Sequence, residues 1–91
     1  MTTYYRQHPG LRLTNVEDEG IVLHLDTRRY FSVNETGLLI LEALHRPQSA
    51  EQLVDVLVER YQVAPELARD CVAQFLTSCQ DSELVVHSDA A

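Results

Sequence analysis

The residue types that most often carry chemistry are sparse in this sequence. The chain of 91 residues has two cysteines and four histidines: Cys71, Cys79, His8, His24, His45 and His87. No two histidines stand four positions apart and no Cys-x-x-Cys motif occurs, so the spacings that typify a zinc site are missing. The three glycines are scattered, which excludes a glycine-rich phosphate loop. We therefore expect neither a metal site nor a cofactor.

A thiol nucleophile is the catalytic option that the sequence leaves open, with Cys71 attacking and His24 as its base. Cys71 falls on the apolar stripe of a predicted helix, where a thiol is usually an inert core residue. Cys79 stands eight positions further along the same helix, about 12 Å away, which is too far for a disulfide. We expect two buried, reduced thiols, no catalytic residue and no enzymatic activity.

Composition and charge describe a small acidic protein. The 45% apolar content is ordinary for a globular chain, and 91 residues form a single domain because two halves could not each bury a core. The net charge of −7 disfavours a phosphate backbone as the partner. The sequence has neither a membrane-spanning run nor a signal peptide, so we expect a cytoplasmic protein. Residues 1–9 and 87–91 are expected to be flexible ends.

The elements that would position any site begin with three predicted strands. Residues 11–16 alternate in polarity, as in a half-buried strand. Residues 21–25 are apolar and partly β-branched between turn signals, which predicts the central strand. Residues 29–33 return after a tight turn as the third strand. The first third of the chain is therefore predicted to be a small antiparallel meander.

Three helices are predicted to follow the meander. Asn34 is a good N-cap for the first, which is apolar nearly all round, as expected at the centre of a core. Gly37 inside this helix indicates a close approach by a neighbouring element. Ser49 and Gln52 form a capping box for the second helix, which runs to about Tyr61.

The third helix is the most clearly amphipathic segment, and Pro65 suits its first turn. Its apolar residues form one stripe: Ala68, Cys71, Val72, Phe75, Leu76 and Cys79. This stripe predicts that Cys71 and Phe75 face the core. Residues 84–86 then form a last short strand or a tail. The predicted fold class is α+β, with a three-stranded antiparallel sheet followed by three helices.

The second and third helices resemble a helix-turn-helix, so a transcriptional regulator that binds DNA is the alternative function. A recognition helix needs Arg, Lys, Asn or Gln to reach bases and phosphates. The third helix instead opens with Glu66-Leu67-Ala68-Arg69-Asp70, which has two acids and one arginine. Together with the acidic net charge, this argues against nucleic acid.

The outer edge of the third strand is the candidate binding surface. Residues 29–33 have the central strand on one side, contain no proline and include Tyr30 and Phe31. A peptide could add to this edge as a further strand, held by backbone hydrogen bonds and selected by side-chain pockets. The third helix could equally cover the edge, and the residues alone favour neither arrangement.

Several blocks of the sequence resemble PqqD-like proteins, the recognition elements for ribosomally synthesised and modified peptides (RiPPs). Leu23-His24-Leu25-Asp26 is followed by Arg29-Tyr30-Phe31-Ser32-Val33-Asn34-Glu35-Thr36-Gly37 and then by Ile40 and Leu44. Later blocks occur in the expected order: Ser49-Ala50-Glu51-Gln52-Leu53, Tyr61-Gln62-Val63, Val72-Ala73-Gln74-Phe75-Leu76 and Glu83-Leu84-Val85. The resemblance covers residues 10–86 and is greatest to the free-standing PqqD-like chaperones of lasso-peptide biosynthesis in actinobacteria.

This resemblance implies a winged helix-turn-helix fold with three strands and three helices, and a function in peptide binding without chemistry of its own. The leader segment of a precursor peptide would add as a strand to Arg29, Tyr30, Phe31, Ser32 and Val33, in a cleft against the third helix. That helix would offer five side chains to the cleft: Leu67, Cys71, Gln74, Phe75 and Ser78. In the lasso branch, the bound leader would be presented to a separate transglutaminase-like cysteine protease. The chain is expected to be a monomer or a weak homodimer.

Overall fold

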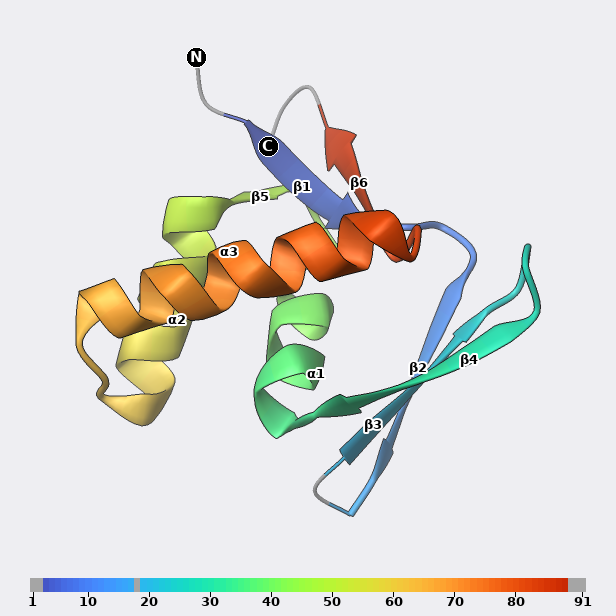
Figure 1. The fold of residues 1–91 in the computed structure, drawn as a ribbon, viewed down its shortest axis with the longest axis horizontal. Coiled ribbons are helices and arrows are strands. Elements are labelled where there is room, and N and C mark those ends of the chain that lie inside the picture. Colours follow the sequence, from blue (N-terminus) through green and yellow to red (C-terminus); the bar gives the residue numbers. More distant parts are fainter. Residues whose placement is uncertain (1–2, 18, 89–91) are drawn as a thin grey trace.

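The chain folds into two small antiparallel sheets and three helices, and the computed structural model describes residues 3–17 and 19–88. The elements in chain order are β1 (Tyr4–Gln7), β2 (Leu11–Val16), β3 (Glu19–His24), β4 (Arg29–Asn34), α1 (Glu35–Ala43), β5 (Gln48–Ser49), α2 (Ala50–Tyr61), α3 (Pro65–Asp81) and β6 (Val85–Ser88). One sheet has the order β2-β3-β4 and the other β5-β1-β6. Figure 1 shows α3 crossing over α1, with the two sheets on different sides of the molecule.

The predicted meander is confirmed, with β3 as its central strand. β3 pairs along its whole length with β2 on one side and with β4 on the other. A glycine is needed inside β3, because a Cβ on Gly20 would lie 2.8 Å from Cδ1 of Leu38 and 2.9 Å from Cγ2 of Val33. The absence of a side chain at this position therefore lets α1 approach the β3–β4 pair closely.

The helix boundaries follow from the caps that the sequence predicts. The side-chain oxygen of Asn34 accepts a hydrogen bond of 2.8 Å from the Gly37 N–H, which caps the start of α1. Ser49 and Gln52 form the reciprocal capping box of α2, and Pro65 occupies the first turn of α3. The prediction of three helices at these positions is thus confirmed, and with it the α+β class.

The second sheet is a correction to the sequence analysis, which expected flexible ends at residues 1–9 and 87–91. Tyr4–Gln7 forms the middle strand of this sheet, and β6 continues to Ser88. Residues 84–86 were expected to form a last short strand or a tail, and Val85 and Val86 belong to β6. Residues 1–2 and 89–91 lie outside the described residues. The partners of β1 come from distant parts of the chain, so no local pattern could reveal this strand.

α1 lies at the centre of the core, as its apolar surround predicts, and its buried residues include Leu38, Ile40 and Leu41. α3 contributes four buried residues: Ala68, Val72, Leu76 and Cys79. The prediction that Cys71 faces the core is wrong, because Cys71 is exposed, and Phe75 is only half-buried. Fewer residues of α3 are buried than its apolar stripe predicts. Among the described residues, no helix has the length and apolar content that crossing a bilayer would require.

Candidate binding site beside the free edge of the sheet

β4 presents an unpaired edge. β3 occupies one side of β4 over its whole length, and no strand in residues 3–17 or 19–88 pairs with the other side. Alternate N–H and C=O groups of an edge strand point away from its partner, where they are free to pair with another chain. The five residues predicted to form the docking strand all belong to β4: Arg29, Tyr30, Phe31, Ser32 and Val33.

The side chains of β4 divide between the two faces of the sheet. Phe31 and Val33 are half-buried and pack against the core. Tyr30 and Ser32 are exposed on the opposite face, with 71% of Tyr30 accessible. The Arg29 guanidinium lies over the Phe31 ring, 5.5 Å from its centre. A strand added to this edge would therefore lie beside Phe31 and Val33 on the inner face and beside Tyr30 and Ser32 on the outer face.

A groove of about 320 Å³ opens where β4 leads into α1. Its lining comes from the end of β4, the first turns of α1 and the middle of α3: Asn34, Thr36, Gly37, Ile40, Cys71, Gln74 and Phe75. Ile40 and Phe75 supply apolar surface, and Thr36 and Gln74 supply polar groups. A lining that combines apolar surface with polar groups in similar measure can hold the side chain of a bound peptide.

The Phe75 ring sets the separation between α3 and α1 at this groove. A Cβ on Gly37 would lie 2.8 Å from Cε1 of Phe75 and 3.2 Å from Cβ of Val33, so only glycine leaves room for the ring. The close approach predicted from Gly37 is thereby confirmed. Phe75, Gly37 and Val33 meet at the point where the free edge of β4 ends.

The structure brings together three of the five residues predicted on α3. Cys71, Gln74 and Phe75 line the groove. Leu67 lies one turn before Cys71 and is 60% accessible. Ser78 lies one turn beyond Gln74 and lines a separate hollow on the helix. All five residues follow one side of α3, and their contact with a peptide stays a prediction.

The α1 side of the groove was missed by the sequence analysis. Thr36, Gly37 and Ile40 follow the cap at Asn34, and the sequence analysis did not include them among the peptide-binding residues. The signal that could have found them is Gly37, because a glycine inside an apolar helix marks a close approach. Its neighbour could be assigned only once Phe75 was placed.

The two thiols do not form a catalytic arrangement. Cys71 is exposed in the groove, and no histidine is among the residues that line it. His24, the base considered for Cys71, is buried at the end of β3 and hydrogen-bonded to backbone groups. Burial raises the pKa of the Cys79 thiol to about 12, so this thiol stays protonated and unreactive at neutral pH.

His8, His24 and Asp26 form a cluster that the sequence analysis did not foresee. One atom from each lies within 4.8 Å of the others, and Nε2 of His8 is 3.6 Å from a carboxylate oxygen of Asp26. The rings also bind the backbone: Nδ1 of His8 accepts from the Gly10 N–H, and Nε2 of His24 donates to the Glu83 carbonyl at 3.1 Å. These bonds give the cluster a structural role, in which it joins the strand turns to the loop after α3.

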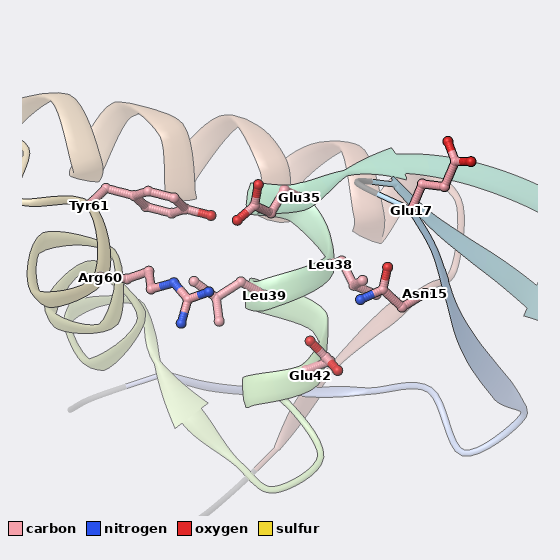
Figure 2. Close-up of a pocket in the computed structure, with 8 residues that line it drawn as sticks. All are labelled: Asn15, Glu17, Glu35, Leu38, Leu39, Glu42, Arg60 and Tyr61. Carbon is pink, nitrogen blue, oxygen red and sulfur yellow. The ribbon is translucent and has the colours of Figure 1, made fainter.

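A second pocket, of about 180 Å³, lies on another face of α1 (Figure 2). It is lined by Asn15, Glu17, Glu35, Leu38, Leu39, Glu42, Arg60 and Tyr61. Figure 2 shows the Tyr61 ring pointing from the end of α2 toward Glu35. The Tyr61 hydroxyl is buried and has no hydrogen-bond partner among the described residues. The lining contains neither cysteine nor histidine, so this pocket lacks the pair of a thiol nucleophile and an imidazole base.

The charges of α3 do not support the DNA-binding alternative. Arg69 is the one basic residue of this helix, and it pairs with Glu51 of α2 at 3.5 Å. The adjacent exposed residues Glu66 and Asp70 are acidic and would repel phosphates. The first half of α3 is therefore unsuited to follow a nucleic-acid backbone.

The family model described as coenzyme PQQ synthesis protein D (PqqD) matches residues 19–85, which include β3, β4, all three helices and the groove. No curated protein gave a match to the chain. The matched segment therefore contains both the free strand edge and the α3 residues that line the groove.

Solved structures share the fold over nearly the whole chain. One is described as TbiB1 in complex with the TbiA(beta) leader peptide, with a TM-score of 0.77, 24% identity, and coverage of 94% of this chain and 98% of that one. A lasso peptide synthetase B1 complexed with the leader peptide has a TM-score of 0.75, 21% identity, and coverage of 90% and 96%. The PqqD part of PqqCD from Methylobacterium extorquens, described as a stand-alone RiPP recognition element, has a TM-score of 0.77, 16% identity, and coverage of 91% and 88%.

Proposed function

This chain belongs to the PqqD family, and we propose that it binds the leader segment of a ribosomally synthesised precursor peptide by adding that leader as a strand to β4. The observation that carries the proposal is the unpaired edge of β4 beside the groove under α3. Two proteins with the same fold are described as complexes with a leader peptide, one of them a lasso peptide synthetase. The precursor of a lasso peptide is therefore the ligand class that we propose.

Backbone hydrogen bonds and side-chain contacts would have different roles in recognising the leader. The N–H and C=O groups on the open side of β4 would hold the leader in register without regard to its sequence. Alternate leader side chains would point inward, toward Phe31, Val33 and the groove lined by Ile40 and Phe75. We expect an aliphatic or aromatic leader residue to be the main anchor, because such side chains supply most binding energy when buried in a pocket.

The chain would contribute affinity and orientation, and a separate enzyme would break or form bonds in the precursor. For a lasso precursor, the proposed partner is a transglutaminase-like cysteine protease that cuts after the bound leader. We expect the chain to act in the cytoplasm as a monomer or a weak homodimer. The net charge of −7 favours a leader that is neutral or basic.

A direct test is titration of a fluorescently labelled leader peptide from the precursor encoded beside this chain. We expect saturable binding, and at least a tenfold loss of affinity in one of the variants Ser32→Pro and Val33→Pro. Neighbouring residues of a strand turn their N–H groups to opposite sides, so one of these prolines removes a donor from the open edge and the other disturbs the pairing with β3.

A modified leader keeps this test independent of protein folding. N-methylation at alternate leader residues removes the peptide donors that would pair with β4 and leaves the protein untouched. Methylation in one alternation should abolish binding, and methylation in the other should have a smaller effect. Equal binding of both methylated leaders would show that the peptide does not add as a strand.

A further inference from the structure

The outer face of the β2-β3-β4 sheet, turned away from the helices, carries a group of half-buried and exposed apolar side chains. In β3 these are Ile21 and Leu23, followed by Leu25 just after the strand. Tyr30 of β4 lies directly opposite Leu23 in the register. Leu25 is 42% accessible and Tyr30 is 71% accessible. Two half-buried and two exposed apolar side chains gathered on one face are typical of a surface that contacts another protein.

The end of this face near the β3–β4 turn has a hollow and two arginines, whereas Glu19, the acidic residue of β3 on the same face, lies at the opposite end of the strand. Leu23, Leu25, Arg28 and Tyr30 line a hollow of about 450 Å³. The other arginine of the face is Arg12, opposite Leu23 on β2. Asp26, the acid of the β3–β4 turn, is turned to His8 at 3.6 Å. A local excess of arginine on a chain with a net charge of −7 favours a partner with a carboxylate at this position.

Arg28 occupies a position in the turn where a side chain is unfavourable. Its φ of 59° lies in the left-handed region that glycine adopts without penalty. The Arg28 guanidinium has no ion pair within the described part of the chain. The exposed Arg28 guanidinium is therefore available to pair with a group on another molecule.

The outer face is also continuous with the proposed leader site. Side chains of a strand alternate between the two faces of a sheet, so a leader added to β4 would place every second residue beside Tyr30 and Ser32. The leader side chains that point toward the core would contact the groove. The alternate leader side chains, which point outward, would extend the apolar surface around Leu23.

We propose that the outer face of the β2-β3-β4 sheet is the docking surface for the enzyme that processes the bound precursor. This inference rests on the proposed function. The partner would insert an apolar side chain into the hollow at Leu23 and Tyr30 and would pair a carboxylate with Arg28. It would contact this chain and the outward residues of the leader together. The enzyme would thereby engage the precursor preferentially when the leader is in place.

The test measures leader affinity and enzyme docking separately in the same variants. Leader affinity is measured by fluorescence anisotropy. Docking is measured as the concentration of this chain that gives half-maximal acceleration of precursor cleavage by the transglutaminase-like protease. Arg28→Gly should leave leader affinity within twofold, because it keeps the turn, and should raise the half-maximal concentration at least tenfold. Arg28→Glu and Leu23→Thr should raise it further.

Gln62→Gly is the matched control, because Gln62 has a similar φ of 54° at the end of α2, away from this face. It should change neither readout. Absence of leader binding by the wild-type chain would remove the proposed function, and this inference with it. Normal leader binding with unchanged acceleration in Arg28→Glu and Leu23→Thr would overturn the inference alone. It would also be overturned if sedimentation showed a dimer that Leu23→Thr dissociates, because the face would then be covered by a second copy.

Discussion

The Phe75 ring occupies the space that a side chain on Gly37 would need, since a Cβ there would lie 2.8 Å from Cε1 of Phe75. The same virtual Cβ would lie 3.2 Å from Cβ of Val33, so the ring, the start of α1 and the end of β4 share one tightly packed point. This contact fixes how far α3 stands from the proposed peptide site.

Gly37→Ala should therefore destabilise the protein by about 1–2 kcal/mol, because overpacking outweighs the gain in helix propensity of up to about 1 kcal/mol. Urea unfolding checks the stability, and leader titration should show weaker binding as α3 is displaced. The double variant Gly37→Ala/Phe75→Leu should recover much of the stability, because leucine leaves space for the methyl group. A more stable single variant would contradict this packing.

The two cysteines should react very differently with iodoacetamide. Cys71 is exposed in the groove and Cys79 is buried with a raised pKa, so we expect alkylation of Cys71 alone in the folded protein and of both in denaturant. Mass spectrometry assigns the sites, and Cys71→Ser should show no native labelling. A bound leader should slow the reaction of Cys71 at least tenfold. Labelling at the same rate with and without leader would place the peptide elsewhere.

The stability of the protein should decrease in alkaline solution because of Cys79. Burial raises the pKa of this thiol from 9.0 to about 12. Above pH 9.0 the unfolded chain releases the thiol proton while the folded chain keeps it, so the unfolded state is favoured increasingly as the pH rises toward about 12. The limiting slope is about 1.4 kcal/mol per pH unit.

Cys79→Ala is the control for this pH dependence, because it removes the thiol and leaves the other titrating groups in place. Urea unfolding of both proteins under reducing conditions should show their stability difference shrinking as the pH rises above about 9. A difference that stays constant across this range would mean that the Cys79 thiol titrates alike in both states.

Substitution of His24 should lower the free energy of unfolding, although His24 is not part of the groove. It is 1% accessible, donates from Nε2 to the Glu83 carbonyl and accepts on Nδ1 from the Thr27 N–H. His24→Phe should cost about 1–3 kcal/mol in urea unfolding, because backbone groups lose their partners in a buried place. The exposed His45 provides the comparison, and His45→Phe should change stability by less than about 0.5 kcal/mol. Equal effects of the two substitutions would refute the role assigned to His24.

Features that depend on neighbouring residues could be predicted from the sequence, and features that depend on distant ones could not. The Asn34 cap and the Ser49–Gln52 capping box are local hydrogen-bond patterns, and both are confirmed. β1 was missed because its partners lie near residues 48 and 88. The cluster of His8, His24 and Asp26 was missed for the same reason, since it joins two turns that only the folded sheet brings together.

The exposure of Cys71 shows a different limit of sequence reasoning. Helical periodicity places Cys71 and Phe75 on the same stripe as Val72 and Leu76, and it gives no measure of how wide a stripe the neighbouring helix will cover. In the structure the covered line is narrow, so Cys71 lies in the groove and Phe75 at its margin. The residues were therefore placed on the correct helix, and only packing could divide them between core and cleft.

The pairing of β1 with β6 has a consequence for how such a module can be joined to other proteins. Tyr4 lies opposite Ser88, so the described chain enters and leaves the fold at neighbouring positions (Figure 1). A short linker between these two points would permit circular permutation, with new ends opened in a surface loop. A tether attached at either point would leave from the same place on the molecule, and gene fusion in either order would give a similar arrangement.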